Sequence, residues 1–78
     1  MTRPPETDEA QAVRALGATV RDSRKRLGLS VHALAEKAGV SFGLVSQLER
    51  GMGNPSLQSI HRLAGALGVP VGQLLDEP

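Results

Sequence analysis

An all-α fold of five short helices is the fold class that this sequence predicts, on three observations. Apolar residues recur at helical spacing between residues 13 and 27, and again between residues 57 and 67. The apolar segments are followed by glycines, which favour the left-handed cap at the end of a helix. No alternating polar and apolar run is long enough to indicate a strand. The expected domain spans residues 8–75, between a disordered tail at 1–7 and a short tail at 76–78.

Capping residues delimit the first three helices. A first helix can begin at Asp8 as its N-cap and end at Gly28. Serines precede the next two helices, which we expect over residues 31–38 and 42–50. The capping serines are Ser30 and Ser41, and the apolar stripe of the first helix is Val13, Leu16, Val20 and Leu27.

Two more helices are expected toward the C-terminus. Asn54 is a favourable N-cap and Pro55 a favourable first residue, so the pair predicts the start of a fourth helix that ends at Gly68. Pro70 can begin a short fifth helix. The expected apolar stripe of the fourth helix is Leu57, Ile60, Leu63, Ala64 and Leu67, and the fifth helix holds Leu74 and Leu75.

The composition argues against several classes of function. The 78 residues include no Cys, Trp or Tyr, one Phe and two His. Disulfides are therefore excluded, and the histidines have no partners at metal-ligand spacing. A surface that stacks sugars or single-stranded bases needs more aromatic rings. No apolar run reaches the roughly 20 residues of a membrane span, and none is typical of a signal peptide, so we expect a cytoplasmic protein.

Charge is distributed unevenly along the chain. Residues 10–75 carry eight Lys and Arg against three Asp and Glu, whereas the two ends carry one against five. A basic domain with acidic ends is typical of a protein that binds a polyanion. The alternative is that these are ordinary solvated charges.

Residues 31–50 have the pattern of a helix-turn-helix. Only residues 39–41 separate the two expected helices. Ala35 is small where a second helix must approach closely, and Gly39 four residues later supplies a positive φ for the turn. Val45 follows six residues after the glycine. The alternative is another kind of αα-corner. The apolar residues that can share a core are Leu34, Ala38, Val40, Val45 and Leu48.

Residues 15–75 resemble the XRE-type, lambda-repressor-like family of helix-turn-helix transcriptional regulators. The resemblance is carried by Arg24 and by the segments 28–30, 34–41, 46–51, 54–56 and 67–69. It implies a compact five-helix domain that binds operator DNA, usually as a dimer. The run Leu-Val-Ser-Gln-Leu-Glu-Arg-Gly followed by Asn-Pro-Ser is most similar to the branch in which a cupin-type sensor domain follows.

The outward face of the third helix is the candidate surface for reading bases. Val45 and Leu48 are expected to point inward, and the opposite face carries no carboxylate that would repel phosphate. Gln47 can bind adenine through two hydrogen bonds, and Phe42 can contact a thymine methyl. The alternatives are that Phe42 folds back onto the domain and that Gln47 is only solvated. The resemblance implies base contacts at Phe42, Gly43, Ser46 and Gln47.

Phosphate contacts are expected around this face. The helix N-termini at Ser30 and Ser41 can receive phosphates, and Asn54 is a further candidate. Arg50 can bind a phosphate or only complement the helix dipole. The resemblance also implies a backbone contact at position 31, where the family commonly has Gln and this chain has Val31.

Two other groups of residues are expected to support the fold or the assembly of the protein and not to contact DNA. The family pairs the positions of Arg24 and Glu49 in a salt bridge. It also places dimer contacts near the C-terminal end of the domain. The expected dimer interface is Val69, Val71, Leu74 and Leu75, although these residues could instead close the core of the monomer.

The function predicted is sequence-specific binding of double-stranded DNA by a transcriptional regulator, most simply a repressor and a homodimer. The alternative is a helical protein-interaction or antitoxin-like module. No nucleophile–base pair, phosphate-binding glycine loop or carboxylate pair indicates an enzyme, and no cofactor is expected. Sensing of a small molecule would require a domain absent from this chain.

Overall fold

The computed structural model describes residues 8–75, which form five helices and, within that range, no strand. The predicted all-α fold class is therefore confirmed. The tails expected at 1–7 and 76–78 lie outside the described residues. The helices are α1 (Asp8–Arg26), α2 (Val31–Ala38), α3 (Phe42–Glu49), α4 (Leu57–Leu67) and α5 (Val71–Leu75).

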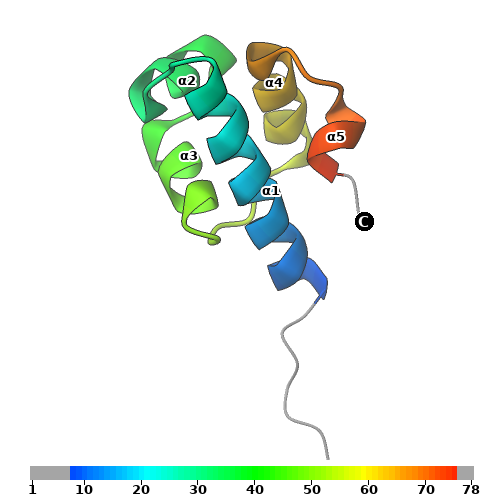
Figure 1. Cartoon of the computed structure of the whole chain (residues 1–78). Coiled ribbons are helices and arrows are strands. Elements are labelled where there is room, and N and C mark those ends of the chain that lie inside the picture. The colour runs from blue at the N-terminus through cyan, green and yellow to red at the C-terminus, as the bar shows by residue number, and fades with distance from the viewer. Residues whose placement is uncertain (1–7, 76–78) are drawn as a thin grey trace, which may run out of the picture.

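The long helix α1 runs diagonally across the molecule, with α2 and α3 on one side of it and α4 and α5 on the other (Figure 1). It packs against α3, α4 and α5, and α2 packs against both α3 and α4. The short helix α3 is therefore held by α1 and α2, so one of its faces is buried and the other is open to solvent.

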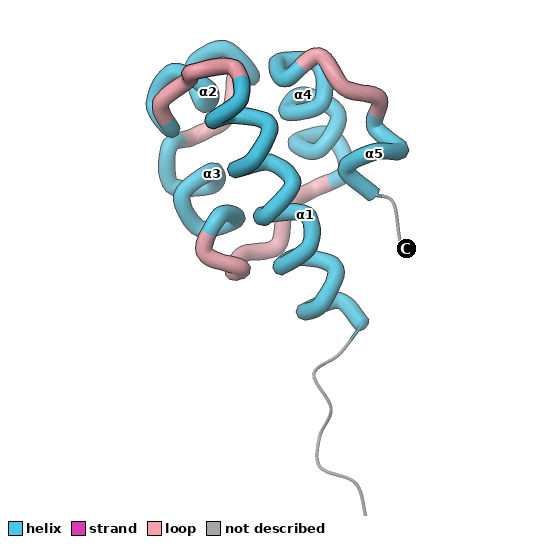
Figure 2. The backbone as a smooth tube through the Cα atoms, in the orientation of Figure 1, coloured by secondary structure: helices cyan, strands magenta, loops and turns pink. Residues whose placement is uncertain are grey.

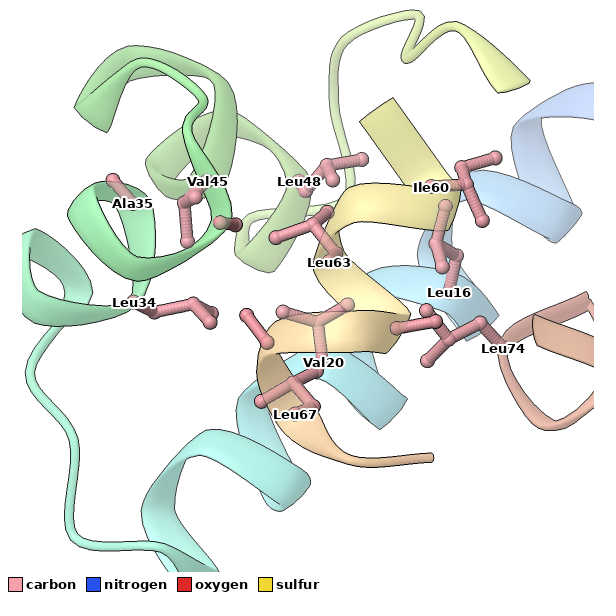
Figure 3. Close-up of a cluster of buried hydrophobic side chains, with 13 residues drawn as sticks. Leu16, Val20, Leu34, Ala35, Val45, Leu48, Ile60, Leu63, Leu67 and Leu74 are labelled. Atoms are coloured by element: carbon pink, nitrogen blue, oxygen red, sulfur yellow. The ribbon is translucent and has the colours of Figure 1, made fainter. Parts of the chain in front are cut away.

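The core consists of aliphatic side chains from all five helices (Figure 3). Val20 of α1, Leu34 of α2 and Leu63 of α4 are fully buried, together with Val45 and Leu48 of α3. Leu74 of α5 is 4% exposed and closes one end of this core. The burial of Val45 and Leu48 fixes the rotation of α3 about its own axis, and hence which of its residues face outward.

Two leucines that the sequence predicts in buried stripes are exposed. Leu27 is 52% exposed and lies just after Arg26, the last residue of α1, two turns beyond Val20, the last fully buried residue of the stripe. Leu57 is 60% exposed, because it is the first residue of α4 and lies one turn before Ile60, where the buried stripe begins. Helical spacing alone therefore extended both stripes too far.

Serine N-caps begin three of the helices. The Oγ atoms of Ser30, Ser41 and Ser56 each accept a bond of 3.0 Å from the backbone N–H three residues ahead. The predicted start of the fourth helix at Asn54 is wrong, since Ser56 caps α4. Its hydroxyl also donates to the Ser59 hydroxyl at 3.0 Å, which favours the start at this serine. Asn54 and Pro55 instead belong to the preceding loop.

A glycine sets the contact between α1 and α3. A Cβ built on Gly17, in the middle of α1, would overlap the carbonyl oxygen of Leu48 in α3. The two backbones are therefore too close for any side chain at this position. Because a glycine inside a helix costs about 1 kcal/mol relative to alanine, its presence here is explained by this close approach.

Candidate nucleic-acid interface

The connection between α2 and α3 is a tight turn of three residues (Figure 2). Gly39 adopts φ 74° and ψ 31°, and its N–H bonds to the carbonyls of Ala35 and Glu36 at the end of α2. Ala35 and Val45, one from each helix, are buried. These features define a helix-turn-helix in which α3 is the second, exposed helix.

The exposed face of α3 contains no carboxylate. Phe42, Gly43 and Gln47 are exposed and Ser46 is half-buried, while Val45 and Leu48 point into the core. The structure thus brings the four expected base-reading residues onto one surface. A Cβ at Gly43 would have only the Ser41 hydroxyl within 4.0 Å, so the backbone there is open to close approach.

Phe42 neither folds into the core nor stands alone on the surface. Its side chain is 44% exposed, and its ring stacks on the imidazole of His32 in α2. The ring centroids are 4.1 Å apart and the planes are inclined by 20°. Sequence reasoning missed this pair, because the two residues meet only when α2 and α3 are packed against each other.

Several expected phosphate ligands surround this face. The backbone N–H groups in the first turns of α2 and α3 have no acceptor inside their helices other than the capping serines Ser30 and Ser41. Arg50 is exposed at the end of α3, where its Nε donates to the Ser46 carbonyl at 3.4 Å. Asn54 is exposed in the loop after α3.

Val31 departs from what the resemblance implies. Its side chain is half-buried and packs against the core, and valine has no hydrogen-bonding group. Only its backbone N–H, in the first turn of α2, remains as a ligand for a phosphate. The side-chain contact that the resemblance implies at this position is therefore one that valine has no group to make.

Arg24 and Glu49 form an ion pair below the exposed face. The guanidinium donates from Nε to Oε2 at 2.7 Å and from NH2 to Oε1 at 2.8 Å, and its third nitrogen bonds to the Leu29 carbonyl at 2.8 Å. The hydrogen bonds that Arg24 donates to Glu49 raise the pKa of Arg24, against the opposing effect of burial. The pair turns the one carboxylate of α3 away from the exposed face.

Arg62 of α4 is a second cation that contacts the motif. It donates to the carbonyl oxygen of Gly39 at 3.2 Å, just beyond the C-terminus of α2. A cation there complements the partial negative charge at the end of the helix. Sequence reasoning counted Arg62 only as part of the net charge, because no local pattern links it to a turn 23 residues away.

The C-terminal apolar residues divide into three groups. Leu74, which the sequence predicts at a dimer interface, is instead part of the core of the monomer because α5 packs against α1 and α4. Val69 and Val71 are half-buried against that core. Leu75 is 43% exposed. Of the four, Leu75 therefore offers the most surface to a partner.

The described part of the chain has no group of three or more His, Asp or Glu side chains placed to hold a metal ion. Over the same residues, no helix is both long enough and apolar enough to cross a membrane.

These features define the class of protein. The helix-turn-helix family HTH_3 matches residues 20–74, which include all of α2, α3 and α4. The chain belongs to this family of XRE-type helix-turn-helix proteins. The resemblance stated from the sequence is confirmed at this level.

Particular relatives are similar over most of this chain. The transcriptional regulator SinR of Bacillus subtilis is 41% identical over 63 residues, which are 80% of this chain and 57% of SinR. The chain thus spans little more than half the length of that relative. The structure of SinR in complex with DNA superposes with a TM-score of 0.74 at 40% identity, over 78% of this chain and 98% of the other. The hypothetical transcription factor NHTF from Neisseria superposes with a TM-score of 0.80 at 36% identity, over 99% of this chain and 90% of the other.

Proposed function

We propose that this domain binds double-stranded DNA sequence-specifically as part of a transcriptional regulator, with α3 in the major groove. The observation that carries the proposal is the outward face of α3, which is free of carboxylates and open to solvent on the second helix of a helix-turn-helix. SinR, whose DNA complex has this fold, supports the assignment. The residues proposed to read bases are Phe42, Gly43, Ser46 and Gln47.

Phosphate binding would fix the register of α3 on the duplex. The N-termini of α2 and α3, capped by Ser30 and Ser41, offer N–H groups to two points of the backbone. The amide of Val31 is one of these groups. Arg50 and Asn54 flank the exposed face at the other end of α3. Repression follows from this mode of binding wherever the operator overlaps a promoter.

We further propose that two copies bind one operator. One recognition helix contacts only a few base pairs, and two-fold symmetry doubles the sequence that is read. The surface proposed for this contact is formed by Leu75 with the half-buried Val69 and Val71.

Regulation by a small molecule would lie outside this chain. The SinR relative is longer than this chain. We propose that any ligand binds to a sensor domain of a longer protein, and the run Leu-Val-Ser-Gln-Leu-Glu-Arg-Gly followed by Asn-Pro-Ser favours a cupin-type domain. The domain itself is proposed to act in the cytoplasm on DNA, without catalysis and without a cofactor.

Selection of duplexes from a random pool, followed by a gel shift with specific and random competitor, tests the function. A recovered consensus that binds much more tightly than random DNA supports it. Equal, weak binding to every sequence would overturn it and leave the protein-interaction or antitoxin-like function. The surface to examine would then be an apolar groove formed by α1, α4, α5 and the loop that follows α3. Its lining includes Val13, Met52, Ile60 and Leu75.

A further inference from the structure

The stack of His32 on Phe42 spans the helix-turn-helix. His32 is the second residue of α2 and Phe42 is the first residue of α3, so the pair joins the two helices on the outside of the turn. Both side chains are exposed, and Phe42 is the only Phe, Trp or Tyr of the chain. An exposed phenyl ring held by one neighbour leaves the rest of its surface available to a ligand.

The position of the stack restricts what it can contact. Phe42 shares the exposed face of α3 with Gly43 and Gln47. The neighbouring Gly43 has no side chain, so nothing on that residue competes for the space beside the ring. A phenyl ring has no hydrogen-bond donor or acceptor for base edges, and the group in the major groove that it suits is the C5-methyl of a pyrimidine.

His32 limits the freedom of the ring. A phenylalanine at the exposed start of a helix has several rotamers to choose from, and a ligand that selects one of them must restrict that freedom. Offset or parallel stacking on the imidazole favours the one orientation seen here. The relative position of the two helices is set by their direct packing, in which Leu34 of α2 and Val45 of α3 are both fully buried.

We propose that His32 is a positioning residue that holds the Phe42 ring to recognise a C5-methylated pyrimidine in the operator. The inference rests on the proposed DNA-binding function and specifies one base of its site. The methyl group can come from thymine or from 5-methylcytosine, which present the same group at the same place in the groove. His32 acts through the Phe42 ring and makes no base contact of its own.

The experiment uses the selected operator, in which each thymine of a half-site is replaced singly by deoxyuridine. Loss of the methyl at the contacted base should weaken binding about fourfold, which is about 0.8 kcal/mol, the value of one buried methylene. A second set of duplexes carries cytosine or 5-methylcytosine at that base. If the protein recognises the methyl group, it binds the duplex with 5-methylcytosine at that base more tightly than the duplex with cytosine.

Two variants at position 32 separate positioning from other roles. His32→Ala should bring the ratio of thymine to deoxyuridine affinity close to one, as Phe42→Ala does. His32→Tyr keeps an aromatic ring to stack but has no imidazole, and should retain most of the ratio. The matched control is His61→Ala, which removes the other histidine, exposed on α4, and should leave the ratio unchanged. Thermal melting of each variant checks that it is folded.

Three results would overturn the inference. One is a wild-type protein that binds the operator but does not distinguish thymine from deoxyuridine at any position. Another is a His32→Ala variant whose affinity falls by the same factor for the thymine and the deoxyuridine duplexes. That result would indicate a phosphate contact by His32. The third is loss of the ratio in His32→Tyr. A wild-type protein that shows no preference for any duplex contradicts the proposed function itself, and so is distinguishable from these three.

Discussion

Arg24 and Glu49, which are 25 residues apart in the chain, bind each other through two hydrogen bonds of 2.7 and 2.8 Å. Their side chains are only 12% and 9% exposed, so solvent screens the pair weakly. The bonds join the last turn of α1 to the last residue of α3. The guanidinium also binds the carbonyl of Leu29, which orders the turn before α2. The ion pair thus holds α3 in the orientation that its exposed face requires.

Arg24→Ala should therefore destabilise the domain. The substitution leaves the Glu49 carboxylate with little solvent and without its partner, and the loss of one member of such a pair costs about 3 kcal/mol. Urea denaturation followed by circular dichroism measures the change. Lys25→Ala, at the exposed neighbouring position, is the control and should change stability by less than about 0.5 kcal/mol. If unfolding is unchanged while DNA affinity falls, Arg24 is a DNA ligand and its structural role is refuted.

Gly17→Ala should also destabilise the domain, by about 1–3 kcal/mol, because the added methyl overlaps the carbonyl of Leu48 and pushes α3 away from α1. The matched control is Gly65→Ala in α4, where a Cβ would meet no atom within 4 Å. That substitution should stabilise by about 0.5–1 kcal/mol through helix propensity. Equal effects of the two substitutions on the free energy of unfolding would contradict the close approach at Gly17.

Local chemistry explains which parts of the fold were predictable from the sequence. The capping serines Ser30 and Ser41 and the turn glycine Gly39 act through bonds to residues at most four positions away. Such interactions leave a pattern in the sequence that a reader can recognise. The same reasoning failed at Asn54, because Ser56, two residues later, is also a favourable N-cap and its bonds determine the start of α4.

The features that the sequence did not reveal are tertiary. Gly17 and the stack of His32 on Phe42 depend on the distance between helices. An apolar residue such as Leu74 is expected in the sequence whether it packs in the core of its own chain or against a second copy. Only the position of α5 shows that Leu74 is buried in its own core. The outward face of α3 could be predicted, because Val45 and Leu48 lie on one side of a single helix and are buried. That Phe42, Gly43, Ser46 and Gln47 on this face read bases is implied by the family resemblance and stays a prediction.

Gln47→Ala should weaken binding to the best operator by about 1–3 kcal/mol and relax the preference at one base pair. Gln47 is exposed on α3, and its amide can donate to and accept from one adenine. Titration of duplexes with each base pair at every position measures the effect. Gln11→Ala, at an exposed glutamine of α1 that lies on neither α3 nor α5, is the control and should leave affinity unchanged. Equal losses on operator and random DNA would contradict a role in base reading.

Arg50→Ala should instead weaken binding to all duplexes alike. A cation that binds phosphate releases about one counterion, so its removal should lower the slope of log affinity against log salt by about one unit. Affinities measured at several salt concentrations, on operator and on random duplex, give this slope. A loss confined to one base pair would place Arg50 among the base-reading residues.

Assembly on the operator should bring two chains to one site, with half-sites about 34 Å apart along the duplex. Sedimentation of the protein with its selected operator should then give two chains per duplex, and the selected sequence should be pseudo-palindromic. Leu75→Glu should reduce binding of the second chain, because Leu75 is 43% exposed and lies on the proposed contact surface. The variant should still fold, since the neighbouring Leu74 remains in the core.

The control for this substitution must be at least as exposed as Leu75 and lie away from α5. Leu57→Glu meets that condition, because Leu57 is 60% exposed at the start of α4. It adds the same charge in place of the same side chain, so a general effect of charge on DNA binding would appear in both variants. Loss of the second chain with Leu75→Glu alone places the contact at α5. A single wild-type chain on a sequence without symmetry would refute the dimer and require the operator to be read by α3 of one molecule.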